Sequence, residues 1–249
     1  MKHLADCEIR LFGTRLSPFV EKVVRALQIK DVPFELVPLK SPADFRRWNP
    51  QTGKMPVLEI DGERFIDSTF IVRVIDERAP APPLFSSDPD TASRQRFIED
   101  WADESLYWYV LALRWVDENA AATLEQVAAS LPVPALLRTV LKPILRRQIR
   151  SIAVAQGMVR LPPHMILEEL DRRFGELEVM LGNAPFFFSE RPGAADVAIF
   201  GQLSTLRSGP TPQGTTLLDR HPRLYDHYRR VEDATVSARV PRSSAQSAA

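Results

Sequence analysis

Two short segments carry residues whose types and spacing could bind a small anionic ligand. Ser17 and Pro18 precede apolar residues spaced by three and four, which predicts a helix with the serine at its N-cap and proline at its first position. A hydroxyl at that place lies beside free backbone amides and the positive end of the helix dipole. Asp67-Ser68 opens a second predicted helix in the same way. Locally, each pair is equally well explained as a helix cap.

The segments around these pairs predict a small mixed sheet. Residues 8–12 alternate charged and apolar side chains, residues 33–39 form a second strand, and a short helix follows at 44–48. Asp61-Gly62 separates two further strands at 55–60 and 63–66, a sequence typical of a tight hairpin with positive φ. A helix between strands favours a parallel pair and a hairpin requires an antiparallel one. We therefore expect an α/β domain over residues 1–79.

The rest of the chain is helical in pattern. Residues 80–93 contain four prolines and little periodicity, which predicts a stiff linker. Residues 94–236 are expected to form an all-α domain, and 237–249 are small, polar and expected to fray. The helices that the pattern predicts cover residues 91–119, 124–131, 135–155, 164–181, 194–206 and 222–235.

Composition excludes several classes of protein. The fractions of 45% hydrophobic and 26% charged residues are those of a globular chain. Thirty-two basic residues balance thirty-two acidic ones, so the chain lacks the overall charge of a nucleic-acid binder. The one cysteine, Cys7, cannot form an internal disulfide, and no Cys and His spacing suggests a metal site. With no secretory segment and no long apolar run, we expect a cytoplasmic protein.

Three ordered segments resemble the cytosolic glutathione transferases, whose thioredoxin-like first domain precedes an all-helical second one. They read LFGTRLSPFVEKVVRAL from Leu11, KMPVLEIDGERFIDSTFIV from Lys54 and GAADVAIFGQL from Gly193. The Ser-Pro-Phe start is most similar to the plant tau type, whereas residues 155–157 look closer to bacterial relatives of the metaxin-like branch. Asp196 matches the aspartate of a buried helix-capping motif. The resemblance implies a homodimeric glutathione transferase that adds the thiol of glutathione, its co-substrate, to a small hydrophobic electrophile without a metal.

The resemblance also implies roles for the two capped helices. Ser17 would be the catalytic residue, donating its hydroxyl to the glutathione thiolate, and Thr14 in the same loop is the rival donor. A free thiol has a pKa of ~8.5, and lowering it by one or two units corresponds to roughly 1.4–2.7 kcal/mol. Asp67 would face the α-ammonium of the γ-glutamyl group, and Ser68 its α-carboxylate.

The remaining glutathione contacts follow from the segment that starts at Lys54. Met55-Pro56 matches the position of a cis-proline in the family, which leaves the adjacent main chain free to pair with an extended peptide. Val57 would supply that main-chain pairing. Lys54 and Lys40 match basic positions near the glycyl carboxylate, although lysines at such places are often simply solvated surface.

Apolar and aromatic side chains on two predicted helices complete the expected site and core. The helix after Asp67 is expected to bury Phe70. Tyr107, Trp108 and Leu111 lie on a helix that borders the electrophile site in relatives, so they are candidates for contacting the hydrophobic substrate. A helical aromatic stripe is also typical of a core. Isomerase chemistry on a maleyl-type substrate would need the same bound thiolate.

One segment departs from the family. From residue 126 to 167 there is no Asp or Glu, and Arg138, Lys142, Arg146 and Arg150 recur every four residues, on one face of a helix that Pro143 should kink. This face is either solvated, or attracts anionic substrates, or contacts an anionic membrane surface. The alternative function is therefore a non-catalytic binding protein that uses the basic helix for a membrane or protein partner.

Overall fold

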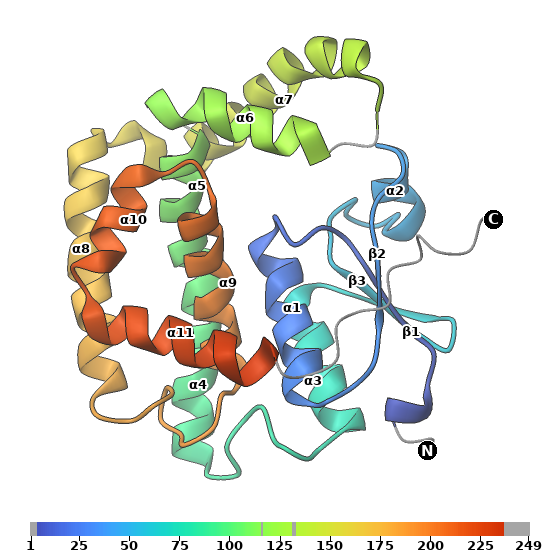
Figure 1. The fold of residues 1–249 in the computed structure, drawn as a ribbon, viewed down its shortest axis with the longest axis vertical. Helices are drawn as coiled ribbons and strands as arrows, with labels where there is room; N and C mark the ends of the chain where they lie inside the picture. The colour runs from blue at the N-terminus through green and yellow to red at the C-terminus, as the bar shows by residue number, and fades with distance from the viewer. Residues whose placement is uncertain (1–3, 116, 131–132, 237–249) are drawn as a thin grey trace.

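The computed structural model describes residues 4–115, 117–130 and 133–236. A four-stranded sheet with its helices forms one side of the molecule, and a bundle of helices forms the other (Figure 1). The predicted α/β domain followed by an all-α domain is confirmed. The tail at 237–249, which we expected to fray, lies outside the described residues.

The sheet is mixed, as the hairpin and the intervening helix predict. Its strands are β1 (Ile9–Phe12), β2 (Glu35–Val37), β3 (Val57–Ile60) and β4 (Glu63–Ile66), in the order β2-β1-β3-β4. β1 pairs in parallel with β2 and antiparallel with β3, which pairs antiparallel with β4. Asp61 and Gly62 have φ of 48° and 89°, the conformation that a two-residue hairpin requires.

Three α-helices belong to the first part of the chain: α1 (Pro18–Ile29), α2 (Asp44–Trp48) and α3 (Ser68–Arg78). A 3₁₀ turn, η1 (Leu4–Asp6), precedes the sheet. The expectation that Phe70 is buried is wrong, because its side chain is 61% exposed. The buried face of α3 runs through Ser68, Ile71 and Ile75, and 100° per residue places Phe70 on the opposite side.

The helical part of the chain begins earlier than the sequence pattern predicts, and its first long helix is interrupted once. α4 starts at Pro89, inside the expected linker, because the Asp88 carboxylate accepts a hydrogen bond from the Thr91 amide at 2.9 Å and caps it. A π-helical turn, η2 (Ala102–Leu106), interrupts the long helix predicted over 91–119. The elements are α4 (Pro89–Trp101), α5 (Tyr107–Trp115), η3 (Asp117–Asn119), α6 (Ala120–Ser130), α7 (Ala135–Gln156), η4 (Met158–Arg160), α8 (Pro163–Leu181), α9 (Ala194–Ser208), α10 (Pro212–Asp219) and α11 (Pro222–Val236).

The two parts pack together through α1 and α9. A Cβ atom at Gly201 would lie 2.4 Å from the Pro18 carbonyl oxygen, so this approach requires a glycine. The Arg25 guanidinium stands 4.3 Å from the centre of the Phe200 ring. The first turn of α1 therefore rests directly on the helical bundle. In the part of the chain that the structure describes, no helix is both long and apolar enough to span a bilayer.

A buried carboxylate organises the start of α9. Asp196 accepts hydrogen bonds from the amides of Gly193 and Phe187, both at 2.8 Å, and contacts His227 Nε2 at 2.7 Å. Asp196 and His227 are fully buried. A Cβ at position 193 would lie 2.6 Å from the Leu84 carbonyl oxygen, so the close approach of these two segments requires a glycine. The pattern of the sequence had given no role to His227.

Candidate active site

Ser17 occupies the N-cap of α1 with extended backbone angles, and its hydroxyl makes no capping hydrogen bond. The side chain is half-buried. Gly13, at the end of β1, has φ of 146°, and a Cβ there would lie 2.6 Å from Val20 Cγ2. The tight turn at this glycine brings the chain from the sheet to the helix, and it leaves the serine hydroxyl available for another partner.

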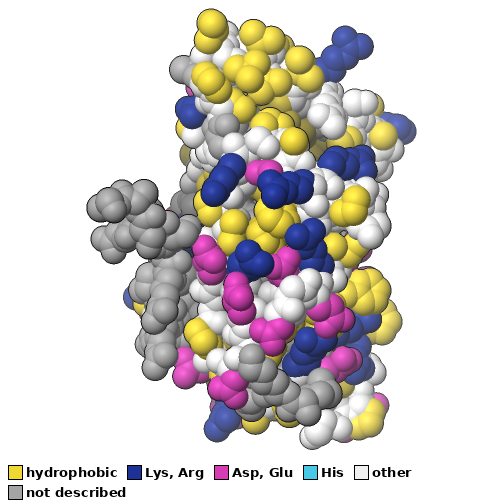
Figure 2. Space-filling model, turned by 90° about the vertical axis from the view of Figure 1, so that its right-hand side faces the viewer, with side chains coloured by type: hydrophobic (Ala, Val, Ile, Leu, Met, Phe, Trp, Pro, Cys, Tyr) yellow, Lys and Arg dark blue, Asp and Glu magenta, His cyan; other side chains and the backbone are white. Residues whose placement is uncertain are grey.

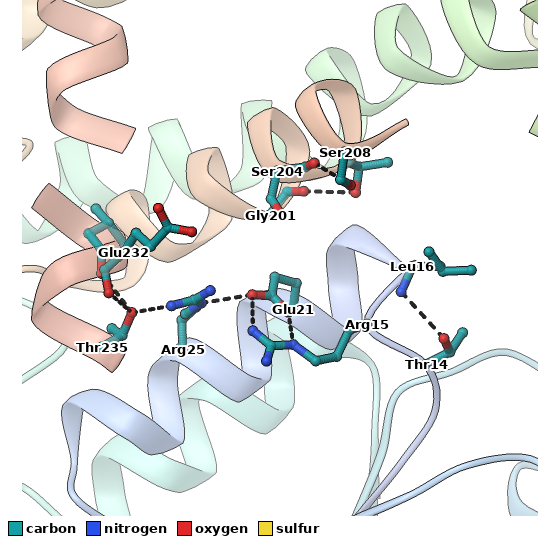
Figure 3. Close-up of polar contacts among 12 residues, drawn as sticks. Thr14, Arg15, Leu16, Glu21, Arg25, Gly201, Ser204, Ser208, Glu232 and Thr235 are labelled. Carbon is teal, nitrogen blue, oxygen red and sulfur yellow. Dashed lines mark hydrogen bonds and ion pairs between the residues drawn. The ribbon is translucent and has the colours of Figure 1, made fainter. Parts of the chain in front are cut away.

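A chain of ionic contacts holds the loop that precedes Ser17 (Figure 3). Arg15 donates from Nε and Nη2 to the two carboxylate oxygens of Glu21, at 2.7 and 2.6 Å, and this pairing raises the pKa of Arg15. Arg25 donates to the same carboxylate at 2.7 Å and to the Thr235 hydroxyl on α11. The loop is therefore tied to α1 and, through Arg25, to the last helix of the bundle.

Thr14, the rival donor, makes a local contact. Its hydroxyl accepts a hydrogen bond from the Leu16 amide at 3.4 Å, as Figure 3 shows. The Ser17 amide donates to the Thr14 carbonyl at 3.0 Å. The Thr14 hydroxyl thus serves the turn, whereas the Ser17 hydroxyl caps nothing.

A pocket of about 260 Å³ lies between the two parts of the chain. It brings together five of the residues predicted to bind glutathione, which are Lys54, Met55, Pro56, Asp67 and Ser68. The remaining lining residues are Phe19, Asn49, Thr52, Ile66, Thr69, Asp103 and Glu104.

The main chain at the cis-proline favours Met55 over Val57 as a partner for a peptide. The Met55-Pro56 bond is cis, as the resemblance implies. Val57 is the first residue of β3 and pairs with Phe12 on one side and Ile66 on the other. Its main-chain groups therefore lie between two neighbouring strands of the sheet, β1 and β4. Met55 precedes the strand and lines the pocket.

The end of the pocket at α3 offers both signs of charge within a short distance. Asp67, with φ of 73°, caps α3 by accepting from the amides of Thr69 and Phe70 at 3.0 and 3.4 Å. Ser68 is the first residue of the helix and is buried. The carboxylates of Asp103 and Glu104 belong to the facing π-helical turn. A helix N-terminus next to carboxylates suits a zwitterion, since the amides attract its anionic group and the carboxylates its cation.

Lys54 lies at the rim of the same pocket on a loop that Asn49 fixes. The buried Asn49 amide donates to the Thr52 hydroxyl at 2.7 Å and to the Lys54 carbonyl at 2.9 Å. The Lys54 side chain is exposed, so its ammonium can meet an anionic group that enters from solvent.

A buried ionic cluster adjoins the pocket and includes Asp103 from its lining. Lys22 of α1 is 1% exposed and donates to Glu99 at 2.7 Å, to Asp103 at 2.6 Å and to the Thr69 hydroxyl at 3.2 Å. Asp103 Oδ1 has no hydrogen-bond partner. Burial raises the pKa of Asp103 because its cost to the charged form exceeds the stabilisation that Lys22 supplies.

The other predicted residues, which include Ser17, Thr14 and Val57, lie outside this lining as far as the described chain shows. Lys40 is exposed between β2 and α2, and its amide donates to the Asp44 carboxylate at 2.7 Å. Tyr107 contacts the Phe19 ring at a centroid distance of 5.0 Å. Trp108 lies edge-on to Tyr107 at 5.1 Å, and Leu111 is buried. These aromatic residues therefore reach the pocket only through Phe19.

Sequence reasoning missed seven residues of the lining, of which Asp103 and Glu104 are the most informative. The available signal is a pair of adjacent carboxylates within an aromatic helical segment, where apolar side chains are expected. Charged residues at such positions indicate a polar site. In the described ranges, no three His, Cys, Asp or Glu side chains converge as they would around a metal ion.

Comparisons with known proteins identify the family. Residues 11–83 match the family described as Glutathione S-transferase, N-terminal domain, and residues 170–231 match Glutathione S-transferase, C-terminal domain, which together cover more than half of the chain. The chain belongs to the glutathione S-transferase family.

Relatives of this glutathione S-transferase family member agree in sequence and in fold. Glutathione transferase GST 23 of Zea mays is 36% identical over 112 residues, which are 42% of this chain and 50% of the relative. The chain thus spans about half the length of the curated relatives it matches. The tau-class enzyme of mango has a TM-score of 0.61 at 22% identity and 92% coverage of both chains. Rice GST1 in complex with glutathione has a TM-score of 0.58 at 22% identity, covering 95% and 92% of the two chains.

Proposed function

We propose that the chain is a glutathione transferase that binds glutathione in the pocket between α1, β3 and α3 and uses Ser17 to stabilise its thiolate. The observation that carries this proposal is the set of five predicted ligand-binding residues, from two separate segments, that line one pocket. The structure of Rice GST1 in complex with glutathione supports the choice of co-substrate.

Glutathione has two charged ends that fit the two ends of the pocket. The α-ammonium of its γ-glutamyl group would lie against Asp67 and Asp103, and the adjacent α-carboxylate would accept from the hydroxyl and the backbone amide of Ser68. Lys54 would meet the glycyl carboxylate. We assign the main-chain pairing of the cysteinyl unit to Met55, because Val57 is occupied within the sheet.

The chemistry combines the bound thiol, an electrophile and water with residues of this chain. The thiol loses its proton to water, and the Ser17 hydroxyl and the amides of the first turn of α1 stabilise the sulfur anion. The sulfur then forms a bond to an electrophilic carbon, whose electron pair leaves with a departing group or moves onto the acceptor and takes up a proton from water. Phe19, with Tyr107 and Trp108 behind it, gives the electrophile an aromatic wall. Leu111 remains a candidate contact.

We also propose that the protein is a homodimer joined through α3 and α4. Phe70 and Phe97 are 61% and 77% exposed on these helices, which meet around Lys22. Large exposed aromatic side chains are typical of interfaces. Sedimentation velocity should give a dimer for the protein and a monomer for Phe70→Ser/Phe97→Ser. A cytoplasmic location belongs to the same proposal, and it is supported by the single cysteine.

Ser17→Ala tests the catalytic assignment. Losing a stabilisation of roughly 1.4–2.7 kcal/mol should lower kcat/KM for a halonitroarene about 10- to 100-fold and raise the pKa of bound glutathione by one to two units. The pKa is read from thiolate absorbance in the binary complex. Thr14→Val is the matched control, since its hydroxyl serves only the turn. Wild-type rates for Ser17→Ala, or an equal loss for Thr14→Val, would contradict the assignment.

Glutathione binding itself separates this proposal from the non-catalytic alternative. A thermal shift with millimolar glutathione should stabilise the protein, and Asp67→Asn should reduce that shift. The absence of any shift and of any conjugation would favour a binding protein on the same scaffold.

A further inference from the structure

Helix α7 exposes large apolar side chains over much of its length. Of the α7 side chains that the structure describes, only Ala153 is buried. Leu136 is 83% exposed, and Val140 and Ile144 are each 57% exposed. Figure 1 shows α7 with α6 at one end of the molecule, and Figure 2 shows hydrophobic side chains gathered at that end, beside Lys and Arg. A solvated surface helix normally turns such side chains inward.

The three most exposed apolar residues share one face of the helix. Leu136, Val140 and Ile144 are four residues apart, so at 100° per residue they form a continuous stripe. The half-buried Leu145 and Ile149 point to the other side, where α7 packs on α5 and α6. The stripe therefore faces away from the protein.

Two arginines without an ion pair in the described chain flank this stripe on one side, and a third, Arg147, lies within it, since 100° per residue places it between Leu136 and Val140. Arg146, Arg147 and Arg150 are exposed, and no ion pair holds them in the described part of the chain. The other two basic residues of the helix do have partners. Lys142 pairs with Glu125 at 2.5 Å, and Arg138 donates to the Val133 carbonyl at 2.9 Å.

The local charge is strongly positive although the whole chain is neutral. No Asp or Glu occurs between residues 126 and 167, whereas the full chain has 32 basic and 32 acidic residues. The positive field thus belongs to α7 and its flanks. A surface that complements it must carry negative charge and also accept an apolar stripe.

We propose that α7 binds the surface of an anionic lipid bilayer, parallel to its plane. Leu136, Val140 and Ile144 would enter the boundary between headgroups and acyl chains, and the flanking arginines would contact headgroup phosphates and carboxylates. An amphipathic helix with arginines beside an apolar face has the properties of an interfacial membrane helix. A second copy of the chain fits this face poorly, because pairing two such faces would bring their unpaired arginines together.

The membrane-binding face is separate from the glutathione pocket. No described residue of α7 lines that pocket. Variants of α7 should therefore keep glutathione conjugation, and this proposal can fail while the proposed activity holds, or the reverse.

Co-sedimentation with vesicles tests the proposal. The full chain should sediment with vesicles of 30% phosphatidylserine in phosphatidylcholine at low ionic strength, at least tenfold more than with phosphatidylcholine alone. Binding should fall as salt is raised to physiological strength. Arg146→Glu/Arg147→Glu/Arg150→Glu should lose most of the binding. Leu136→Ser/Val140→Ser/Ile144→Ser should weaken it and make the remainder more salt-sensitive.

A control with the same change of charge keeps the test specific. Arg191→Glu/Arg220→Glu/Arg229→Glu reverses three exposed arginines elsewhere and should bind as the wild type does. A far-UV circular dichroism spectrum and a thermal transition like those of the wild type show that each variant is folded. The proposal is overturned by no sedimentation at low ionic strength, by equal binding to neutral vesicles, or by equal losses in the two charge-reversal variants. The other possible occupant is a second copy of the chain. It would be identified if the wild type does not bind lipid and if only the apolar substitutions lower its mass in solution.

Discussion

Lys22→Met removes a cation that is sealed between the two parts of the chain. The ammonium has three acceptors, Glu99, Asp103 and the Thr69 hydroxyl, at 2.7, 2.6 and 3.2 Å. Methionine matches the length of the lysine stem but carries no charge, so the substitution leaves two carboxylates buried next to each other without a counter-charge. Their mutual repulsion and lost hydrogen bonds should lower the free energy of unfolding.

The size of the effect follows from burial. Lys22 and Glu99 are each 1% exposed and Asp103 is 8% exposed, so solvent screens the cluster little. Removing one partner of such a buried cluster costs about 3–5 kcal/mol. For a chain of this length that corresponds to a decrease in Tm of roughly 6–20 °C. The neutral variant Lys22→Met/Glu99→Gln/Asp103→Asn should recover more than half of the loss, because it leaves no buried charge unpaired.

The pH dependence of the loss identifies its cause. Burial already raises the pKa of Asp103 in the folded protein, so the folded state binds this proton more readily than the unfolded chain does. Protonation therefore stabilises the fold as pH falls through the raised pKa, and the same carboxylate destabilises it above. Without Lys22 this dependence should steepen. The difference in stability between Lys22→Met and the wild type should shrink as pH is lowered from 8 to 5.

Thermal and urea denaturation at pH 5, 6.5 and 8 measure these differences for the wild type, Lys22→Met and the neutral variant. Arg73→Met is the matched control, since this arginine is exposed on α3 and should change stability by less than about 1 kcal/mol. A Lys22→Met protein as stable as the wild type at pH 8, or a loss that does not depend on pH, would refute the reasoning.

Three further substitutions probe other buried or ionic contacts. Gly201→Ala places a Cβ 2.4 Å from the Pro18 carbonyl, so it should cost about 1–3 kcal/mol of stability and lower kcat, measured by urea denaturation and steady-state kinetics. Asp196→Asn should destabilise by about 3 kcal/mol or more in thermal denaturation, because it breaks a fully buried pair with His227. Glu21→Gln weakens both guanidinium contacts that hold the Ser17 loop, so kcat should fall more than the KM for glutathione rises.

Much of the first domain could be predicted because its signals are local. The hairpin at Asp61-Gly62 and the helix after Ser17-Pro18 depend on residues adjacent in the chain, and the structure places both within a residue or two of the prediction. The segment containing Pro56 was identified by resemblance to relatives.

The parts that sequence reasoning missed depend on contacts distant in the chain. Asp103 reaches the pocket because the π-helical turn reorients the residues after α4, and helical periodicity carries no sign of such a turn. The pairing of Asp196 with His227 joins residues 31 positions apart. An apolar side chain next to Ile71 is expected to share its burial, but α3 carries apolar residues on two faces, and Phe70 lies on the exposed one.

The contact between Gly201 and Pro18 has a consequence for how the two domains could be recombined in evolution or in the laboratory. The helix that follows Ser17 begins where it touches α9, so the position of this serine depends on the shape of a helix from the other domain. A chimera that joins this first domain to a foreign helical half should conjugate well only if the donor also has a glycine at the matching position. The junction, more than the linker sequence, would decide which halves are interchangeable.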